Sequence, residues 1–416
     1  MSEKKSTAYI VLVLGLLVVI GPLTVDMYLP GFPAIAAELN ASIADIQLSL
    51  ASYFIGLAVG QLIVGPLTDR FGRKPPLYVG LTIYIIVSIV CIWAPSAMAL
   101  VALRFVQALG ASVGMVVARA VVRDLFAPEE MARVFSWLML VMGVAPIIAP
   151  TLGGMLVTYA GWESIFLALA IISTISLIGM RLLLPETRQP DTSVSLHVKP
   201  IMREYWQIFK NRQFIIYVLV GGISAGGMFA YISGSPFVFI ELHGVTEAQY
   251  GWIFGANAFG LIMAGQINRF WLRFHTTAQI IRIVNAIQVV FGLLLVFYAS
   301  TYWGGLPVFI GILFIYMALI GFIFPNKTAL ALAPFTRNAG AASALMGSLH
   351  FIISGAASAA VSVLHNETAL PMTTVMAGCS ILTFLILHFG AKSKPEHKPK
   401  KAIQREEKEQ KPVPVS

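Results

Sequence analysis

The sequence is poor in charged residues and in cysteine. Only 11% of its 416 residues are charged and 58% are hydrophobic, whereas soluble globular proteins carry about a quarter charged residues. So few charges could not cover the surface of a soluble chain of this length. The composition therefore excludes an ordinary cytosolic enzyme, a secreted disulfide-rich protein and a disordered protein, and it predicts a polytopic membrane protein.

The sequence also lacks motifs for metal binding, nucleotide binding and covalent catalysis. Its two cysteines, Cys91 and Cys379, lie in separate apolar runs, so we expect buried free thiols rather than metal ligands. No phosphate-binding glycine loop, zinc-ligand spacing or nucleophile elbow occurs. The sequence therefore predicts no enzyme, no cofactor and no metal, and it gives no support for ATP-driven transport.

Much of the basic excess of the chain lies at its C-terminus. The chain has 28 Lys and Arg against 19 Asp and Glu, and residues 392–416 hold eight of these basic residues but only four of the acidic ones. Such a segment, with prolines and few apolar residues, is typical of a disordered and solvated tail. We therefore expect a cationic cytoplasmic tail and no nucleic-acid partner.

Long apolar runs make up most of the remaining sequence. A helix needs about 20 apolar residues to cross a hydrocarbon core of roughly 30 Å. Twelve runs approach or exceed this length, and they predict about twelve transmembrane helices. The runs are Ala8–Ala37, Ile43–Leu67, Pro75–Trp93, Ala97–Val122, Ala132–Thr158, Ser164–Leu184, Phe214–Ile240, Ala248–Ile267, Ala278–Ala299, Leu306–Phe324, Ala339–Leu364 and Met372–Gly390.

The charges between the runs predict the orientation of the chain. If both termini are cytoplasmic, the outward loops contain no Lys or Arg, whereas the inward loops hold many, among them Lys327 and Arg337. This pattern follows the positive-inside rule. We therefore expect a multi-pass membrane protein with both termini in the cytoplasm. The alternative, a cleavable signal peptide in the first run, is disfavoured because the run is too long.

A polar segment divides the runs into two sets of six, as in many secondary transporters. A faint repeat supports the division, because Gly65–Lys74 in the first set has a degraded counterpart in Gly265–Arg273 in the second. We predict an N-terminal six-helix bundle (1–187), a cytoplasmic linker (188–212), a C-terminal six-helix bundle (213–391) and the tail (392–416).

The segment Gly65–Lys74 resembles the signature loop of the major facilitator superfamily. Gly65 and Gly72 permit a tight turn between helices, and Asp69 can accept hydrogen bonds or pair with Arg73 or Arg123. A basic loop that only sets topology is the alternative, but an acid in such a loop does nothing for topology. The resemblance implies an inner gate, for which the candidates are Asp69, Arg70, Arg73, Arg123 and Asp124.

Two further segments resemble drug:proton antiporters of this superfamily. Leu103–Gly110 resembles the motif that places an arginine, here Arg104, inside the membrane. A later segment resembles the antiporter motif, with Ala149 where a glycine usually stands, and ordinary tight packing of small residues is the alternative for it. The residues of this second motif are Gly143, Pro146, Pro150, Gly153 and Gly154.

The first run narrows the resemblance to one branch. Leu23–Pro33, together with Gln47–Ser49 and Arg119–Asp124, resembles the Bcr/CflA type associated with bicyclomycin and chloramphenicol resistance. The resemblance implies an all-α major facilitator fold of two pseudo-symmetric six-helix bundles. It also implies alternating-access efflux of small amphipathic drugs across the bacterial inner membrane in exchange for protons, by a monomer. A proton-coupled exporter of a metabolite or amino acid is the first alternative, and a membrane sensor without transport is the second.

Asp26 and Arg104 are the ionisable residues that we place deepest within the runs. Intramembrane charges are costly and usually face a cavity. At 1.5 Å per residue, Asp26 lies about 16 Å and Arg104 about 10 Å from the outer face, a difference that an arginine side chain largely bridges. We predict that Asp26 carries the coupling proton and that Arg104 is its electrostatic partner. The alternatives are a helix-end role for Asp26 and support of backbone carbonyls by Arg104, and His350 is a weaker candidate for proton transfer.

Several aromatic and amide side chains in the runs are candidates for an amphipathic substrate cavity. Packing is the commoner role of such residues in helices, so each is weighed against that alternative. The candidates are Tyr28, Tyr53, Gln61, Phe229, Tyr231 and Asn257.

Overall fold

The computed structural model describes residues 3–191, 198–335 and 338–390, and the predicted tail lies outside them. All regular structure in the described residues is helical, as lipid requires of a backbone that must satisfy its own hydrogen bonds. The helices are α1 (Glu3–Asp26), α2 (Phe32–Glu38), α3 (Ile43–Phe71), α4 (Lys74–Cys91), α5 (Ala97–Leu125), α6 (Pro128–Ala160), α7 (Glu163–Leu183), α8 (Val198–Phe209), α9 (Arg212–Pro236), α10 (Glu247–Trp271), α11 (Thr277–Thr301), α12 (Gly305–Leu332), α13 (Ala339–Val363) and α14 (Leu370–Phe389).

Eleven segments of the described chain are long and apolar enough to cross a membrane, with α1 and α2 counted as one. The helix α10 has 25 residues and packs within the bundle like the others, but polar residues such as Asn257 and Gln266 lower its apolar content. With α10 the bundle has the twelve long segments that the sequence predicts.

The outer helices carry apolar side chains on their exposed faces. On α7 these residues recur every three or four positions, which places them on one face of the helix. An exposed apolar stripe of this kind is suited to lipid rather than to water. The residues are Leu167, Ile171, Ile175, Ile178 and Leu182.

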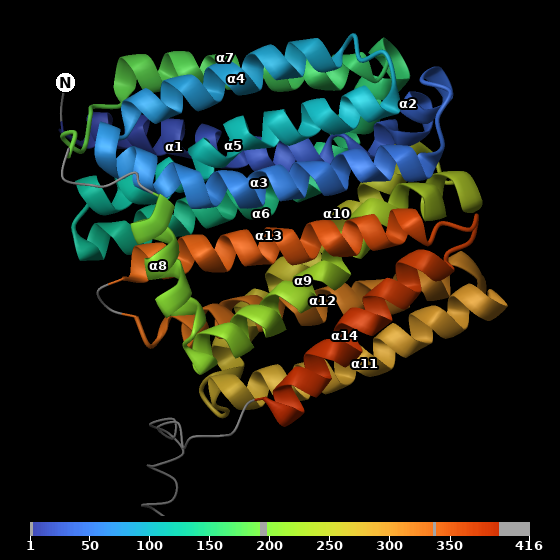
Figure 1. Cartoon of the computed structure of the whole chain (residues 1–416). Coiled ribbons are helices and arrows are strands. Elements are labelled where there is room, and N and C mark those ends of the chain that lie inside the picture. The colour runs from blue at the N-terminus through green and yellow to red at the C-terminus, as the bar shows by residue number, and fades with distance from the viewer. Residues whose placement is uncertain (1–2, 192–197, 336–337, 391–416) are drawn as a thin grey trace, which may run out of the picture.

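The long helices form two groups that follow the order of the chain (Figure 1). In the first, α3 and α4 pack on α5, and α1 packs on α6 and α7. In the second, α13 and α14 pack on α9, and α12 packs on α10 and α11. The groups meet where α3 lies against α13 and α6 lies against α10. This is the two-bundle, all-α arrangement that the sequence predicts.

The first span is interrupted in its middle, which the run of apolar residues does not reveal. The helix α1 ends at Asp26, a 3₁₀ turn covers Leu29–Gly31, and α2 follows. Pro30 has no N–H to donate to the carbonyl of Asp26, which is its partner position in an α-helix, and Pro33 likewise cannot donate to Leu29. The two prolines therefore end α1 at Asp26, the acid in the middle of this span.

Contacts between the two groups join them at the end of the bundle away from α8 (Figure 1). Ser362 of α13 donates a hydrogen bond to the carbonyl of Ala44 in α3 (2.7 Å). Beside it, a Cβ added at Gly355 would lie 3.2 Å from the carbonyl oxygen of Ala51. On the other seam, Gly154 of α6 lies against the backbone of Glu247 in α10. The bundle is thus closely packed at this end.

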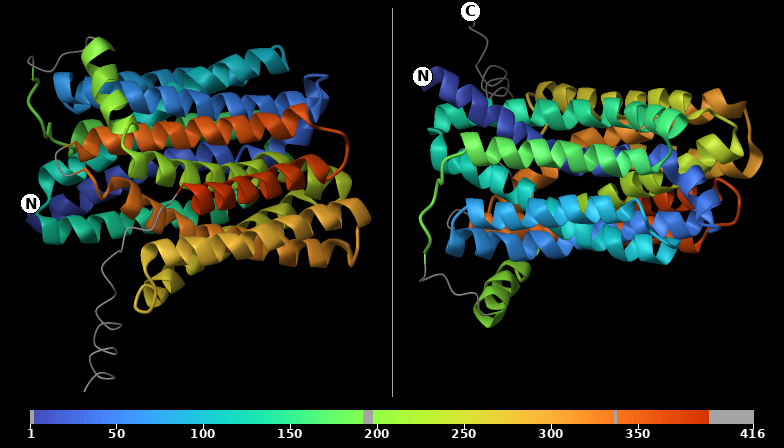
Figure 2. Two further views of the ribbon diagram at one scale, coloured as in Figure 1. Left: turned by 60° about the horizontal axis from the view of Figure 1, so that its bottom comes forward. Right: turned by 90° about the horizontal axis from the view of Figure 1, so that it is seen from above.

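The predicted linker contains a helix, α8, that was not predicted from the sequence. Figure 2 shows α8 crossing the direction of the long helices at the side of the bundle. Tyr205 and Ile208 are buried, whereas Trp206 is exposed, so the helix is amphipathic. The Tyr205 hydroxyl donates to the carbonyl of Leu62 in α3 (3.3 Å). Burial, with the nearby charges of Glu204 and Asp69, raises the pKa of Tyr205 to about 12, so the phenol remains a donor.

Two predictions about loop positions are wrong. Gly65 lies inside α3 rather than in a turn, because α3 continues past the predicted end of its run to Phe71. Lys327 lies inside α12, where it is 5% exposed, rather than in an inward loop. In both cases the helix extends beyond the apolar run, because polar residues near a span's end keep helical hydrogen bonds.

Candidate functional site

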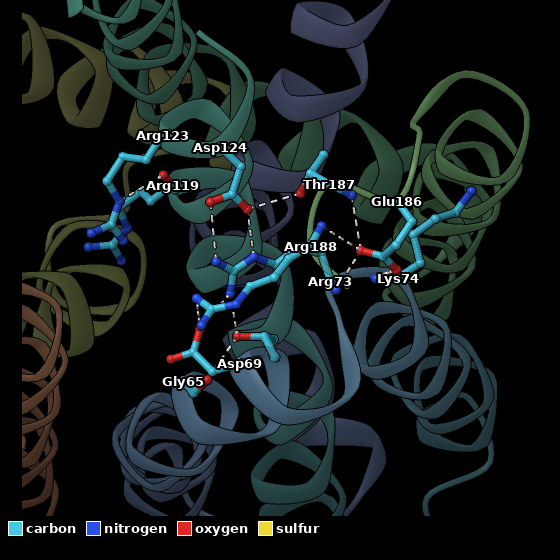
Figure 3. Close-up of polar contacts among 11 residues, drawn as sticks. Gly65, Asp69, Arg73, Lys74, Arg119, Arg123, Asp124, Glu186, Thr187 and Arg188 are labelled. Carbon is cyan, nitrogen blue, oxygen red and sulfur yellow. Dashed lines mark hydrogen bonds and ion pairs between the residues drawn. The ribbon is translucent and has the colours of Figure 1, made fainter. Parts of the chain in front are cut away.

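Arg73, in the loop between α3 and α4, joins two helices through charged contacts (Figure 3). Its Nη1 donates to Asp69 Oδ1 (2.9 Å), and its Nε and Nη2 donate to the two carboxylate oxygens of Asp124 (2.8 and 3.3 Å). Burial disfavours the charged form of Arg73, but the bonds to Asp124 and Asp69 outweigh it and raise the pKa of the guanidinium above its usual value. A paired guanidinium–carboxylate contact fixes orientation as well as distance, so Arg73 ties α3 to the end of α5.

The segment after α7 completes this group of contacts, and its part in them was not predicted from the sequence. Arg188 Nη1 donates to Asp69 Oδ1 (2.9 Å), and Thr187 Oγ1 donates to Asp124 Oδ2 (3.0 Å). Glu186 accepts hydrogen bonds from the backbone N–H groups of Arg73 (2.8 Å) and Lys74 (3.0 Å). The signal was a Glu–Thr–Arg run directly after the proline that ends the sixth apolar run. We call Asp69, Arg73, Asp124, Glu186, Thr187 and Arg188 the loop cluster.

Gly72 lets two backbones pass closely within the loop cluster. Its φ of +87° lies in the region that glycine adopts without strain. A Cβ at this position would lie 2.9 Å from the carbonyl oxygen of Arg188. Of the two glycines predicted for the turn, only Gly72 has this function.

The remaining gate candidates lie near the loop cluster with different contacts. Arg123 Nε donates to the carbonyl of Arg119 (3.4 Å), and Arg119 Nε donates to the carbonyl of Met115 (3.1 Å), all on α5. Arg70 lies in the last turn of α3, and its carbonyl accepts from the N–H of Asp191 (3.0 Å). The structure therefore brings Asp69, Arg73 and Asp124 together, with Arg70 and Arg123 beside them.

Arg104 is fully buried in α5 between two tyrosine rings. Its Cζ lies 4.4 Å from the ring centroids of both Tyr28 and Tyr53. Its Nη1 donates to Gln107 Oε1 (2.6 Å), and its Nη2 donates to the carbonyl of Thr24 (3.0 Å). A guanidinium is attracted to aromatic faces, most strongly where water is excluded. Aromatic faces and neutral acceptors thus surround this charge.

Asp26 lies on another side of α1 from the Arg104 contacts. No ion pair between Asp26 and Arg104, or between Asp26 and another cation, occurs in the part of the chain that the structure describes. Instead Asp26 borders the same cavity as Tyr231 of the second group. The predicted direct pairing of Asp26 with Arg104 is therefore absent from this conformation.

A cavity of about 310 Å³ lies between the two groups of helices. Asp26 borders it, and it is the only acid among the described residues of its lining. The rest of the lining is dominated by methionine and phenylalanine side chains, which adapt to varied apolar shapes. These are Met115, Met142, Met228, Met317, Phe54, Phe229, Phe254, Phe324 and Phe351.

The predicted cavity residues are only partly brought to this cavity. Phe229 and Tyr231 line it, and Asn257 donates to the Tyr231 hydroxyl (3.1 Å) from behind. Tyr28 and Tyr53 enclose Arg104 instead. The remaining candidate, Gln61, packs against Gly347 of α13. His350 reaches the cavity wall through its ring contacts with Phe229 and Phe324.

The predicted antiporter motif forms the seam between α6 and its neighbours. Gly143 and Pro146 line the cavity, and Pro150 is buried one turn further along α6. A Cβ at Gly153 would collide with the carbonyl of Met27, directly after Asp26, while Gly154 lies against α10. Small residues here let α6 approach both the broken first span and the second group.

Comparisons with known proteins agree with this architecture. The family model described as Major Facilitator Superfamily matches residues 14–359. The uncharacterized MFS-type transporter YdgK of Bacillus subtilis is 36% identical, over 87% of this chain and 90% of its own. The bicyclomycin resistance protein homolog of Haemophilus influenzae is 32% identical, over 94% and 98% of the two chains. The multidrug resistance protein MdtL of Escherichia coli is 29% identical, over 91% and 95%.

Solved structures share the fold at much lower identity. A D-xylose-proton symporter matches with a TM-score of 0.73 and 14% identity, over 94% of this chain and 98% of its own. A bacterial homolog of the human lysosomal transporter Spinster, in an inward-facing and occupied conformation, matches with a TM-score of 0.70 and 15% identity, over 94% and 96%. At these identities the likeness concerns the fold alone.

Proposed function

Because this chain belongs to the major facilitator superfamily, we propose that it exports small amphipathic drugs across the bacterial inner membrane in exchange for protons. Two relatives of nearly equal length are named for bicyclomycin and multidrug resistance, which supports drugs as the cargo. The observation that carries the proposal is the position of Asp26, a lone acid on an apolar cavity between the two groups of helices.

Asp26 is the site at which proton and drug exchange in this proposal. A carboxylate enclosed by apolar groups without a counter-ion is costly. A proton relieves that cost, and so does the positive group of a cationic drug, but the site does not hold both. Binding of one therefore favours release of the other, which couples their movements in opposite directions.

Arg104 supports Asp26 indirectly in this proposal. Its bond to the Thr24 carbonyl and its contact with the Tyr28 ring hold the first span on both sides of Asp26 in sequence. The electrostatic partnership predicted from the sequence thus becomes positioning: Arg104 fixes the backbone from which the carboxylate reaches the cavity.

The loop cluster suits a bundle that moves as one body. Its contacts join α3, α5 and the segment after α7, so the ends of these helices turn together. We propose that the bundles 1–187 and 213–391 rock about the cavity with 188–212 as their linker, and that Asp69, Arg70, Arg73, Arg123 and Asp124 act as the inner gate. We propose that both termini lie in the cytoplasm. A monomer suffices for transport, because one chain encloses the cavity.

The cavity favours drugs over the alternative cargo, a metabolite or amino acid. An amino acid carries two charges on a small body and needs a dense set of polar partners. Methionine and phenylalanine instead dominate this lining, which suits larger amphipathic molecules. A non-transporting sensor has less support, because the compared relatives include two named for drug resistance.

Replacement of Asp26 by asparagine tests the proposal. In proteoliposomes, Asp26→Asn should abolish proton-driven drug accumulation, because asparagine has nearly the same shape but cannot bind or release the proton. Asp26→Glu should retain partial transport. The measurement is drug-induced pH change inside vesicles at equal protein amounts, with the exposed Glu241→Gln as the matched control. Full coupled transport by Asp26→Asn would remove Asp26 from the proton path.

A further inference from the structure

Lys327 is a buried cation in the second group of helices. It lies five residues before the end of α12, and it is 5% exposed. It forms no ion pair in the portion of the chain that the structure describes. Because a charged side chain is costly inside a membrane unless it is paired or functional, Lys327 needs an explanation other than topology.

The side chain of Lys327 leads into the bundle rather than to the nearby surface. Side chains in a helix lean toward its N-terminus, which for Lys327 is the direction of the bundle's middle. Its stem packs on Gly221 of α9, where an added Cβ would lie 2.6 Å from Lys327 Cε. Because Gly221 has no side chain, it leaves the space that the lysine stem fills. Lysines near span ends usually extend to the membrane interface, but the ammonium of Lys327 stays inside the bundle.

Aromatic rings and a second base surround the ammonium. Lys327 Nζ lies 5.9 Å from the ring centroid of Phe324. The ring of His350 of α13 packs against the same Phe324 ring, at 5.7 Å between ring centroids, and lies 6.3 Å from that of Phe229. Two basic groups thus lie together, and neither has an acidic partner among the described residues.

This basic pair continues one wall of the cavity. Met317 and Phe324 of α12 line the cavity, and Lys327 follows Phe324 by three positions, which places it on a neighbouring part of the same helix face. On α9, Met228 lines the cavity, and Gly221 precedes it by two turns on the same face. The ammonium therefore lies just beyond Phe324, at the end of the cavity toward the C-terminus of α12.

We propose that Lys327 binds the anionic group of acidic amphipathic substrates, aromatic monocarboxylates above all, while their rings occupy the Phe- and Met-lined cavity. The inference rests on the proposed function, because it takes the cavity to be the substrate site. An anionic guest supplies the counter-charge that the ammonium lacks. Asp26 borders the first group's side of the same cavity, so the two walls offer groups of opposite charge to different substrates.

A matched pair of probes tests the proposal on the purified full-length protein. The probes are 1-naphthaleneacetate and its methyl ester, which share a ring system and differ in charge, and binding is measured by calorimetry. Lys327→Met removes the charge at similar length, and Lys327→Arg keeps it. We expect Lys327→Met to weaken acid binding about tenfold or more, as loss of a charge-assisted contact does. Ester binding should be unchanged in both variants, and Lys327→Arg should retain acid binding.

A second variant moves the ammonium without removing it. Gly221→Ala places a methyl group where the lysine stem lies, so it should weaken acid binding and spare ester binding. Equal acid binding by the native protein and Lys327→Met, with ester binding intact, would overturn the inference and leave the proposed function standing. Loss of both probes in Lys327→Met would also overturn it, since Lys327 would then be structural. If the native protein bound neither probe, the substrate cavity and this subsite would both be refuted.

Discussion

Arg104 shows how a buried charge can be accommodated without a carboxylate. Thr24 near the end of α1 and Tyr28 just after it face Arg104, whereas Val25 and Asp26 line the cavity. Successive residues of a helix are rotated by about 100°, so Asp26 and Thr24 point to different sides. Estimates of depth from the sequence could place Asp26 and Arg104 at similar levels, but they could not determine which sides of their helices face each other.

Substitution of Arg104 by lysine should damage the protein although the charge is kept. Lysine lacks the planar group that stacks between two rings and donates to two acceptors. We expect Arg104→Lys to lower the free energy of unfolding by about 2–4 kcal/mol and to reduce transport. Thermal unfolding and vesicle transport measure these effects. Arg181→Lys, at an exposed end of α7, is the control. Equal stability of the two variants would mean that the tyrosine rings and the two acceptors around Arg104 do not require a guanidinium.

At the scale of the element, the positions of the functional groups depend on breaks within helices and on contacts between a segment and the end of another helix. Pro30 and Pro33 end α1 at Asp26, and the segment after α7 reaches back to the start of α4. The apolar runs predict the number of spans, but they carry no information on either feature. Both depend on individual backbone N–H groups. Pro30 lacks one, and those of Arg73 and Lys74 donate hydrogen bonds to the Glu186 carboxylate.

Removal of the break in the first span should impair transport without harming the fold. Pro30→Ala restores an N–H that can donate to the carbonyl of Asp26, so α1 should extend toward α2 and shift the carboxylate. We expect a marked loss of coupled transport with thermal stability equal or higher. Pro75→Ala, in the first turn of α4 where proline costs nothing, should change neither property. Normal transport by Pro30→Ala would mean that the break does not position Asp26.

Glu186 should stabilise the start of α4 from a distance. Its carboxylate accepts from two N–H groups at the N-terminus of that helix, where negative charge is favoured. We expect Glu186→Ala to lower the free energy of unfolding by about 1–2 kcal/mol and to slow transport by loosening the loop cluster. The exposed Glu204→Ala on α8 serves as the control in the same thermal unfolding assay. If both substitutions were equally mild, the segment after α7 would be a passive helix end.

At the scale of the whole molecule, the sequence predicted what depends on composition and missed what depends on contact. The scarcity of charge and the spacing of apolar runs predict the all-α bundle. The Gly65–Lys74 segment predicts an arginine partner for Asp69 but not which one; the structure has Arg73 there. Phe229 and Tyr231 were found because aromatic residues are the usual lining of such cavities. Lys327 was predicted to lie in a loop and α8 was not predicted. A polar residue near the end of an apolar run has the same sequence pattern whether it is buried in a helix or exposed in a loop.

A bulky side chain placed between α3 and α13 should open the end of the bundle away from α8. A Cβ at Gly355 would lie 2.8 Å from Ile55 Cδ1 and 3.2 Å from the carbonyl oxygen of Ala51, so Gly355→Leu cannot fit unless the two groups separate there. A bias of about 1.4 kcal/mol changes the ratio of two conformations tenfold. We therefore expect Gly355→Leu to inhibit transport by favouring a conformation open at this end, which is the outer face in the proposed orientation.

Labelling of a cavity residue measures that opening. Ala258 lines the cavity, and the two native cysteines are buried and can be replaced by alanine. A cysteine introduced at position 258 should react faster with a membrane-impermeant maleimide added outside intact cells when Gly355→Leu is present. Gly311→Leu on α12 is the control, because a Cβ there meets nothing within 4 Å. If the rate from outside were the same in both variants, the α3–α13 seam would not be where the outer face opens.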